Sequence, residues 1–415
     1  MAHSNSTTSL SAGVKALASG AKAFAHTQAL WRFLNNEEVT PLCLSAPLVA
    51  GSQAVVAQAE GDYTLCVHDW SRIQYGRHRS KQDRLQMTHA TDIGYELQSS
   101  LLVHAQDGLP LSVIAQNLVS AQGVWQSRKA TLQPNDQPHL DELSQRIDWI
   151  EQQGLIKRLV HLVDREADSV AHLRQWSRQG HLWLVRAKAG SMVRCGQDDM
   201  SLAALAQQMT FRETRNVICK GQSCTQWIAS THVVLARKAK PTRIDSKGQR
   251  VKAMAGEPLT VRLVVSQIVN EDGDVVAQWY LLGNVPDHVE DTQLALWYYW
   301  RWEIESFFKL LKSAGHQLES WEQETARATF NRLLIATQAC VMAWGLMRTQ
   351  DAAAIQARLF LVRLSGRQMK RARPVTLPAL LDGLFTLFTM LETLEHYALS
   401  ELKNFAQIAK NHLHL

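Results

Sequence analysis

The strongest constraint on the fold is a regular alternation of β-like apolar runs with amphipathic helices across residues 63 to 188. Three apolar runs come first, and the turn residues Gln-Asp-Gly-Leu-Pro at 106 to 110 predict a hairpin between the second and the third. The predicted strands cover residues 63 to 69, 97 to 104, 111 to 118, 155 to 164 and 181 to 188, and the predicted helices cover 140 to 154 and 164 to 176. The order β-β-β-α-β-α-β predicts an α/β fold in which helices flank a mixed sheet.

Length and composition predict a folded chain of several packed units. The chain has 415 residues, of which 46% are hydrophobic, and this excludes intrinsic disorder of the whole chain. Lys and Arg number 44 against 38 for Asp and Glu, so the formal net charge is +6. A modest basic excess suits a polyanionic partner, although alone it is weak support for one.

Cysteine usage and the apolar runs indicate a reducing compartment away from membranes. The six cysteines are scattered and form no CxxC pair, so we expect neither a disulfide framework nor a zinc site. The first 26 residues are rich in Ser and Ala and lack the continuous apolar stretch of a signal peptide, which predicts a cytoplasmic protein. The longest apolar run, residues 333 to 347, is shorter than the about 18 to 20 residues of a membrane span. It predicts a buried helix, and we expect no membrane partner.

Two aspartates occupy equivalent places in the predicted sheet. Asp69 ends the first strand and Asp164 ends the fourth, which we expect to lie beside the first. Neighbouring carboxylates repel each other and cost stability unless a divalent cation or a proton lies between them. Taken singly, each aspartate is more typical of a strand-end turn or a helix cap. His68 precedes Asp69 and faces the opposite side of the strand, where a buried, hydrogen-bonded histidine is the favoured interpretation.

A polar stripe marks the predicted helix that contains Trp-Arg-Trp-Glu-Ile-Glu-Ser at 300 to 306. Its members are spaced 3, 4, 4 and 3 residues apart and therefore share one helix face; they are Tyr298, Arg301, Glu305, Lys309 and Lys312. By itself this stripe could be a ladder of ion pairs on a solvent-exposed face. Together with the two strand-end aspartates, Glu305 would instead complete an all-oxygen ligand set that suits Mg²⁺ or Mn²⁺.

These motifs resemble those of the DDE transposases of bacterial insertion sequences. The stripe matches the signature Y-x2-R-x3-E-x6-K of the branch that contains the transposase of transposon five. His-Asp-Trp-Ser at 68 to 71 is similar to the first-aspartate motif of that branch, and Val-Asp-Arg-Glu-Ala-Asp at 163 to 168 is similar to the second. The resemblance extends from residue 31 to about residue 345.

The resemblance implies a fold, a reaction and a metal site. The fold would be an RNase H-like catalytic core with a β-rich insertion between the second and third acids and with helical N- and C-terminal regions. Asp69, Asp164 and Glu305 would be the catalytic and metal-binding residues and would hold two Mg²⁺ ions, for which Mn²⁺ could substitute. The reaction would be cut-and-paste transposition: donor-strand nicking, hairpin formation and opening, and transfer of the 3′-OH ends into target DNA.

The resemblance divides the chain into five segments. These are a small helical DNA-binding region at 1–60, the first part of the core at 61–189, the β-rich insertion at 190–275, the second part of the core with the signature helix at 276–347, and a helical C-terminal region at 348–415 that would serve dimerisation. Seven Lys and Arg residues between 237 and 252 form a basic loop in the insertion. A loop of this kind is more typical of a solvated charge run than of a nucleic-acid contact.

The resemblance also implies DNA contacts and partners. Trp279 would stack on a flipped base, although a core tryptophan on a strand is an equally good interpretation, and Arg186 would lie near the hairpin phosphates. Tyr298, Arg301, Lys309 and Lys312 would contact the DNA backbone and the flipped base. The partners would be double-stranded DNA, as transposon-end inverted repeats and as target, and a second copy of the chain; no small-molecule substrate is expected. Glu166 and Asp168 are expected to serve a helix N-terminus rather than a metal.

Two alternatives to an active transposase remain open. Thirty residues precede Trp31, whereas relatives in this branch carry a longer N-terminal helical region that grips the transposon end. A chain without that region could be a catalytically silent DNA-binding regulator or inhibitor of transposition. The second alternative is a simple nuclease that cuts DNA without joining strands. The three acids favour an enzyme, and Trp279 with the signature cations favours transposition over simple hydrolysis.

Overall fold

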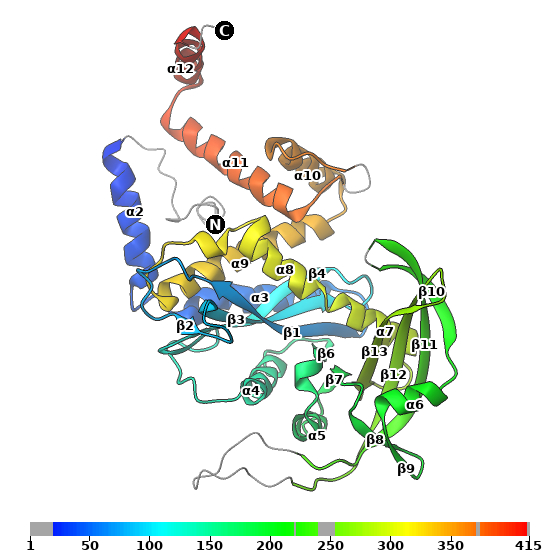
Figure 1. Ribbon diagram of the computed structural model, residues 1–415. Coiled ribbons are helices and arrows are strands. Elements are labelled where there is room, and N and C mark those ends of the chain that lie inside the picture. The colour runs from blue at the N-terminus through cyan, green and yellow to red at the C-terminus, as the bar shows by residue number, and fades with distance from the viewer. Residues whose placement is uncertain (1–19, 220, 240–253, 371–373, 413–415) are drawn as a thin grey trace.

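A computed structural model describes residues 20–219, 221–239, 254–370 and 374–412 (Figure 1). The helices are α2 (Gly20–Asn35), α3 (Pro41–Gln58), α4 (His139–Glu151), α5 (Val170–Arg178), α6 (Leu202–Gln208), α7 (Asp291–Trp300), α8 (Glu303–Lys309), α9 (Ala326–Arg348), α10 (Ala352–Leu364), α11 (Leu377–His396) and α12 (Leu399–His412), with the short helices η1 (Arg165–Ala167), η2 (Leu310–Ala314) and η3 (Leu318–Ser320). The strands are β1 (Tyr63–Gln74), β2 (Leu85–Gln86), β3 (Ile93–His104), β4 (Pro110–Ser120), β5 (Gly123–Gln126), β6 (Arg158–Val163), β7 (Leu182–Ala187), β8 (Met192–Cys195), β9 (Asp198–Ser201), β10 (Arg212–Cys219), β11 (Gln222–Leu235), β12 (Leu259–Asn270) and β13 (Val275–Gly283).

All the described strands belong to one mixed sheet. Its main path runs β5-β4-β3-β1-β6-β7-β13-β12-β11-β8-β9, with β10 paired to β11 and β2 paired to β3. The pairs β1·β6 and β6·β7 are parallel, and the neighbouring pairs β1·β3 and β7·β13 are antiparallel. The expectation of an α/β fold with a mixed sheet flanked by helices is therefore confirmed.

Helices cover both faces of this sheet. In Figure 1, α8 and α9 lie over one face, and α4 and α5 lie over the other. Along β1 the alternate residues Leu65 and Val67 join the core under the first group of helices, while Cys66 joins the core that includes Ile150 of α4. The alternation that defines a strand thus sends neighbouring residues of β1 into two separate layers.

The first strand is longer than its apolar run predicts. Its sequence from residue 63 to 69 predicts a strand that stops at Asp69, but β1 continues to Gln74 because β3 pairs with it along its whole length. On its other side β1 pairs with β6 only as far as His68, because β6 ends at Val163. Asp69 therefore lies inside β1, at the point where the parallel ladder ends.

The predicted insertion extends the sheet and does not form a separate layer. Strand β13 pairs with β7, so β11, β12 and β13 continue the same sheet from the edge that β7 would otherwise leave open. Of the basic loop, only Arg237 and Lys238 fall among the described residues; Lys240, Arg243, Lys247, Arg250 and Lys252 lie outside them. Lys15 also lies outside the described residues.

The predicted single signature helix is interrupted. Helix α7 ends at Trp300 and α8 begins at Glu303, and the backbone N–H groups of Arg301 and Trp302 bond to carbonyls three residues earlier. The last turn, η2, is a π-helix. Tightened and widened turns rotate the residues that follow them, so the five polar residues do not share one straight stripe.

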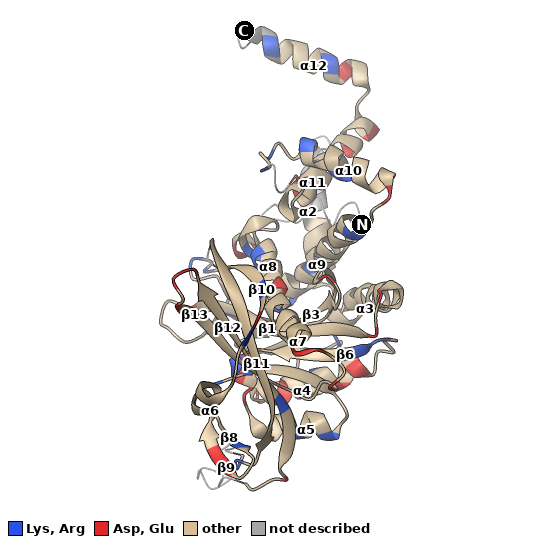
Figure 2. Ribbon diagram, turned by 90° about the vertical axis from the view of Figure 1, so that its right-hand side faces the viewer, with Lys and Arg blue, Asp and Glu red and all other residues tan. Residues whose placement is uncertain are grey.

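The long apolar segments differ in burial. Helix α9 is mostly buried, which confirms the interpretation of residues 333 to 347 as a buried helix. Among the described residues, α11 alone has the length and apolar character that crossing a membrane requires, which is weak support because core helices pass the same test. In both views α11 and α12 extend away from the sheet, and α12 carries both positive and negative side chains (Figure 2).

A glycine in the predicted hairpin sets the contact between the hairpin and α7. Gly108 has φ +76°, and a Cβ atom there would lie 2.5 Å from the indole of Trp300. We expect Gly108→Ala to lower the free energy of unfolding by about 1 to 3 kcal/mol, measured by urea denaturation. Gly154→Ala is the control, because Gly154 also has positive φ but has no atom within 4 Å of an added Cβ. An equal loss in both variants would contradict a role for the Trp300 contact.

Candidate active site

The parallel ladder brings Asp69 and Asp164 side by side. His68 pairs with Val163 in the register of β1 and β6, so the next residue of each strand is an aspartate. Asp164 leaves the ladder and caps η1, where its Oδ1 accepts a hydrogen bond of 2.5 Å from the backbone N–H of Arg165. The sequence places these two acids at neighbouring strand positions, and the structure has them there.

Two cations and a phenol hold the aspartate pair. The guanidinium of Arg301 donates from Nη1 to Asp69 Oδ2 at 2.6 Å, and its Nη2 lies 3.9 Å from Asp164 Oδ2. Arg186 of β7 forms an ion pair with Asp164, with 2.8 Å between Nε and Oδ1. The hydroxyl of Tyr298 donates to the same oxygen at 3.2 Å. Three residues expected to contact DNA thus lie directly on the two acids.

Glu305 faces the same cluster from α8. It is half-buried, and its carboxylate interacts electrostatically with Asp69, Asp164 and Arg301. Lys312 donates to the carbonyl of Arg72 at 2.6 Å and lies 3.4 Å from Glu319, so it contacts the protein at the rim of the cluster. Lys309 is exposed. The interrupted helix therefore runs from buried Tyr298 and Arg301 to solvent at Lys309.

The three carboxyl groups differ in their electrostatic environment. Burial raises the pKa of Asp69, and this effect outweighs Arg301. Burial also raises the pKa of Glu305, with a further contribution from the Asp69 carboxylate. Burial alone would raise the pKa of Asp164 too, but the N–H of Arg165 and the guanidinium groups of Arg301 and Arg186 lower it below its ordinary value.

The ligand type of this cluster suits a hard divalent cation, but the three-ligand group that the described residues bring within 4.8 Å lies elsewhere, at Cys66, His68 and His161. The donor set of the acids consists of carboxylate oxygens from β1, from the end of β6 and from α8, which are the ligands that Mg²⁺ and Mn²⁺ prefer. Asp69 and Glu305 both carry raised pKa values, so an added positive charge would be favourable there. Arg301 now supplies the single cation that bridges the two aspartates.

Trp279 lies beside this cluster on β13. It is half-buried against the core, and its indole meets the ring of Tyr298 at 63° with 5.8 Å between the centroids. Tyr298 connects Trp279 to the acids, because its ring contacts the indole of Trp279 and its hydroxyl donates a hydrogen bond to Asp164. The structure thus places Trp279 next to the acids but partly inside the core, and both of its sequence interpretations stay open.

Glu166 lies in the first turn of η1, in agreement with its expected place at a helix N-terminus. Its side chain is exposed. Desolvation and the neighbouring Asp69 and Asp164 nevertheless raise its pKa despite His139, so Glu166 also interacts electrostatically with the aspartate pair.

Asp168 corrects one expectation from the sequence. The predicted helix from residue 164 to 176 is split into η1 and α5, and Asp168 lies between them. Its carboxylate accepts a hydrogen bond of 3.0 Å from the N–H of Lys188, and it also binds Ser191 and Arg237. Asp168 therefore links the core to the insertion and does not cap a helix. Arg237, expected in a solvated charge run, is half-buried in this contact.

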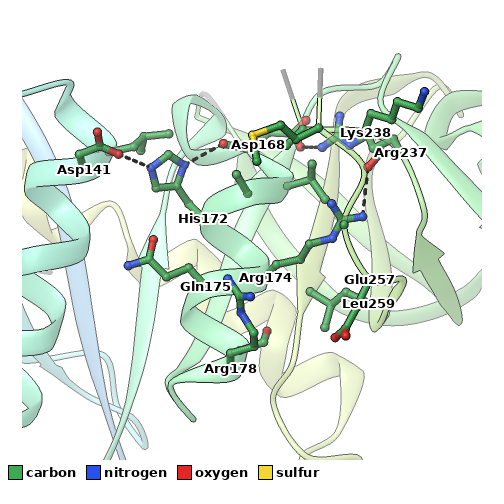
Figure 3. A pocket seen from close by; sticks show the side chains of 18 of the residues that line it. Asp141, Asp168, His172, Arg174, Gln175, Arg178, Arg237, Lys238, Glu257 and Leu259 are labelled. Carbon is green, nitrogen blue, oxygen red and sulfur yellow. Dashed lines mark hydrogen bonds and ion pairs between the residues drawn. The ribbon is translucent and has the colours of Figure 1, made fainter. Parts of the chain in front are cut away.

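A cleft of about 1550 Å³ extends from Trp70 and Glu166 along α5 to the insertion. Figure 3 shows Arg174 reaching from α5 towards the insertion, where it donates to the carbonyls of Leu235 and Arg237 at 3.0 and 3.1 Å. Among the described residues its charged lining is Arg174, Arg178, Lys188, Arg237 and Lys238 against Asp141, Glu166, Asp168 and Glu257. This cleft is therefore of mixed charge and not a strongly basic groove.

His68 lies on the other side of the sheet from Asp69, as strand alternation predicts. It is buried and bonds to Ser100 and His161.

Comparison with known proteins gives little further support. No family model matches the sequence, and no curated protein does. One solved structure with some likeness is a piggyBac transposase synaptic complex with hairpin DNA, at 9% sequence identity and a TM-score of 0.38. The likeness covers 83% of this chain and 56% of that chain, so this chain spans little more than half of its length. At that identity and TM-score the likeness assigns neither fold nor function.

Proposed function

We propose that the chain is a DDE transposase with an RNase H-like core, in which Asp69, Asp164 and Glu305 hold two Mg²⁺ ions. The observation that carries the proposal is the placement of Asp69 and Asp164 side by side by the β1·β6 register, with Glu305 of α8 near enough to interact electrostatically with both. The strand order β4-β3-β1-β6-β7, with β1, β6 and β7 parallel, supports the fold assignment. A pure DNA-binding protein has no physical need for buried carboxylates whose charges repel each other.

The residues around the acids take defined parts in this proposal. Bound Mg²⁺ would supply activation of the attacking hydroxyl and stabilisation of the leaving 3′-oxygen. Asp69 and Asp164 hold their oxygens in place through the β1·β6 register, and Tyr298 orients Asp164 by its hydrogen bond. Arg301 and Arg186 keep the aspartates ionised, and when DNA enters they can exchange carboxylate for phosphate oxygens.

The remaining sequence predictions form the outer part of the proposal. Lys309 and Lys312 would contact the DNA backbone, and the partners would be transposon ends, target DNA and a second copy of the chain. The reaction would proceed through nicking, a hairpin and strand transfer. Such an enzyme acts where the bacterial chromosome lies, so we include a cytoplasmic location in the proposal.

Trp279 tests the hairpin step. If it stacks on a flipped base, Trp279→Ala will slow hairpin formation by about 5- to 150-fold, because base stacking is worth about 1 to 3 kcal/mol. First-strand nicking on the same DNA should change little, and both rates can be followed on denaturing gels. Equal slowing of both steps would show that Trp279 only supports Tyr298 by packing.

The decisive experiment is excision from a plasmid that carries the element's own ends. Wild-type protein and Glu305→Ala are compared with Mg²⁺ and with a chelator. Excision by wild type in Mg²⁺ alone supports the proposal. Binding of the ends without any cutting would favour the silent regulator, and cutting without joined products would favour a simple nuclease.

A further inference from the structure

A cluster of soft ligands lies on the face of the sheet opposite the acids. Cys66 and His68 are two residues apart on β1 and so share a face, and His161 is the register partner of Cys66 on β6. Their ligand atoms all lie within 4.8 Å of one another, and all three side chains are fully buried. All four ring nitrogens of the two histidines have hydrogen-bond partners, and two of these nitrogens, His68 Nε2 and His161 Nδ1, face each other beside the Cys66 thiol.

From this geometry we propose that Cys66, His68 and His161 form a Zn²⁺ site. Imidazole nitrogen and thiolate sulfur are the ligands that zinc binds, whereas Mg²⁺ prefers oxygen. The nitrogens His68 Nε2 and His161 Nδ1 are 2.9 Å apart. Two nitrogens at tetrahedral positions around one zinc lie about 3.4 Å apart, so a small rotation of either ring admits the ion.

The outer ring nitrogen of each imidazole, the one that would not bind zinc, has an oxygen partner. His161 Nε2 lies 2.9 Å from the Glu151 carboxylate at the end of α4, and His68 Nδ1 lies 2.9 Å from Ser100 Oγ on β3. Zinc ligands generally donate their outer N–H to an oxygen in this way, which fixes the tautomer and the ring direction. Ser100 can accept that hydrogen bond because its hydroxyl rotates.

Proton and charge balances are both simple. Without metal, a chain of hydrogen bonds runs from Ser100 through His68 and His161 to Glu151. When zinc binds, the proton of His68 Nε2 is replaced by one on Nδ1, and the thiol proton of Cys66 leaves to solvent. One Zn²⁺, one thiolate and the partly exposed Glu151 carboxylate then sum to zero, and the nearby buried Arg146 guanidinium is paired with Glu142 at 3.4 Å.

An arginine beside the cluster supports a thiolate there. Burial and the Glu151 carboxylate raise the pKa of the Cys66 thiol, and Arg146 of α4, which is 1% exposed, partly offsets them. Within the described part of the chain, its Nε and Nη1 atoms have no hydrogen-bond partner. A thiolate would give this buried guanidinium an acceptor, whereas a neutral thiol is a weak one.

The site would tie together the two strands that carry the acids. Zinc would cross-link β1 to β6 at Cys66, His68 and His161, while Asp69 and Asp164 follow on the same strands. The three ligands are buried away from the cleft, which favours a structural role, and with three protein ligands the fourth position of the ion would be left to water or another ligand. The zinc proposal is independent of the proposed transposase function, because the positions of the three ligands on β1 and β6 do not depend on the activity of the acids.

The test is the metal content of the full chain, purified through a tag that contains no histidine. We expect about one zinc per chain by mass spectrometry, and a thiolate-to-metal charge-transfer band when Co²⁺ replaces zinc. Cys66→Ala should lose both. The control is Cys340→Ala, because Cys340 is also buried and lies 3.2 Å from a histidine, His316, but among the described residues it belongs to no three-ligand group.

A milder variant keeps the test valid if Cys66→Ala does not fold. Glu151→Gln changes a partly exposed residue that contacts the outer nitrogen of His161 and also lies 3.7 Å from Nδ1 of His181. It should weaken zinc binding about 10- to 100-fold in competition with a chelating dye. Absence of bound zinc together with absence of the Co²⁺ band in wild type would overturn the proposal, as would unchanged zinc affinity in Glu151→Gln. Wild-type protein that binds zinc but does not cleave DNA would count against the proposed function alone.

Discussion

We expect Asp69→Ala, Asp164→Ala and Glu305→Ala each to lower the proposed Mg²⁺-dependent DNA cleavage by about a thousandfold or more. Each variant removes one of the proposed metal ligands: the two aspartates that the β1·β6 register places side by side, or Glu305 of α8, which interacts electrostatically with both. Losing a ligand of a catalytic metal removes several kcal/mol of transition-state stabilisation, and about 1.4 kcal/mol corresponds to a tenfold change in rate. Cleavage is measured under single-turnover conditions, with DNA binding followed separately by gel shift.

DNA binding should survive in these variants, because the cations around the cluster remain. Asp287→Ala is the control, because Asp287 is an exposed acid that bonds to His232 and to none of the three acids. We expect it to cleave like wild type. Full activity in any of the three variants would remove that residue from the site, and loss of activity in the control would show that the assay reports general damage.

Arg301→Gln lowers the free energy of unfolding by about 3 to 5 kcal/mol in the absence of divalent cations. The Arg301 guanidinium is buried and bridges Asp69 and Asp164, so its loss leaves a carboxylate pair without its shared cation. Added Mg²⁺ should restore part of this stability by binding the same oxygens. Thermal and urea denaturation with and without Mg²⁺ measure both effects, and wild type should respond less to Mg²⁺ than the variant.

The pH dependence of Arg301→Gln has a defined sign. Burial holds the folded pKa of Asp69 above its ordinary value of 3.8, so protonation favours the folded state. The difference in the free energy of unfolding between wild type and Arg301→Gln should therefore shrink as the pH falls through the folded pKa of Asp69 towards 3.8. Arg186→Gln serves as a comparison, because Arg186 pairs only with Asp164 and is more exposed, and should cost about 1 kcal/mol or less. A Mg²⁺-independent deficit in Arg301→Gln would argue against cation binding at the cluster.

Local sequence patterns predicted the elements well where the pattern was strong. The hairpin at 106 to 110 and the helix over 140 to 154 are present as β3-β4 and α4, because turn chemistry and helical spacing are properties of adjacent residues. The length of β1 was underestimated, because residues 70 to 74 are held in the sheet by β3 and not by their own apolar character. The break after Trp300 was also missed, since a heptad-like spacing does not reveal a tightened turn.

The sequence alone supplied the candidate residues for the proposed chemistry, because two aspartates at strand positions and a Tyr-Arg-Glu-Lys spacing are properties of the chain. Only the tertiary structure decided that Tyr298, Arg301 and Arg186 bind the acids, because these contacts join elements that are distant in the sequence. Tyr298 and Asp164, for example, are 134 residues apart. It also decided that Asp168 binds Arg237 of the insertion. The Cys66, His68 and His161 cluster likewise depends on the β1·β6 register, which no spacing along the chain can reveal. A motif lists side chains, whereas packing sets their distances and charges.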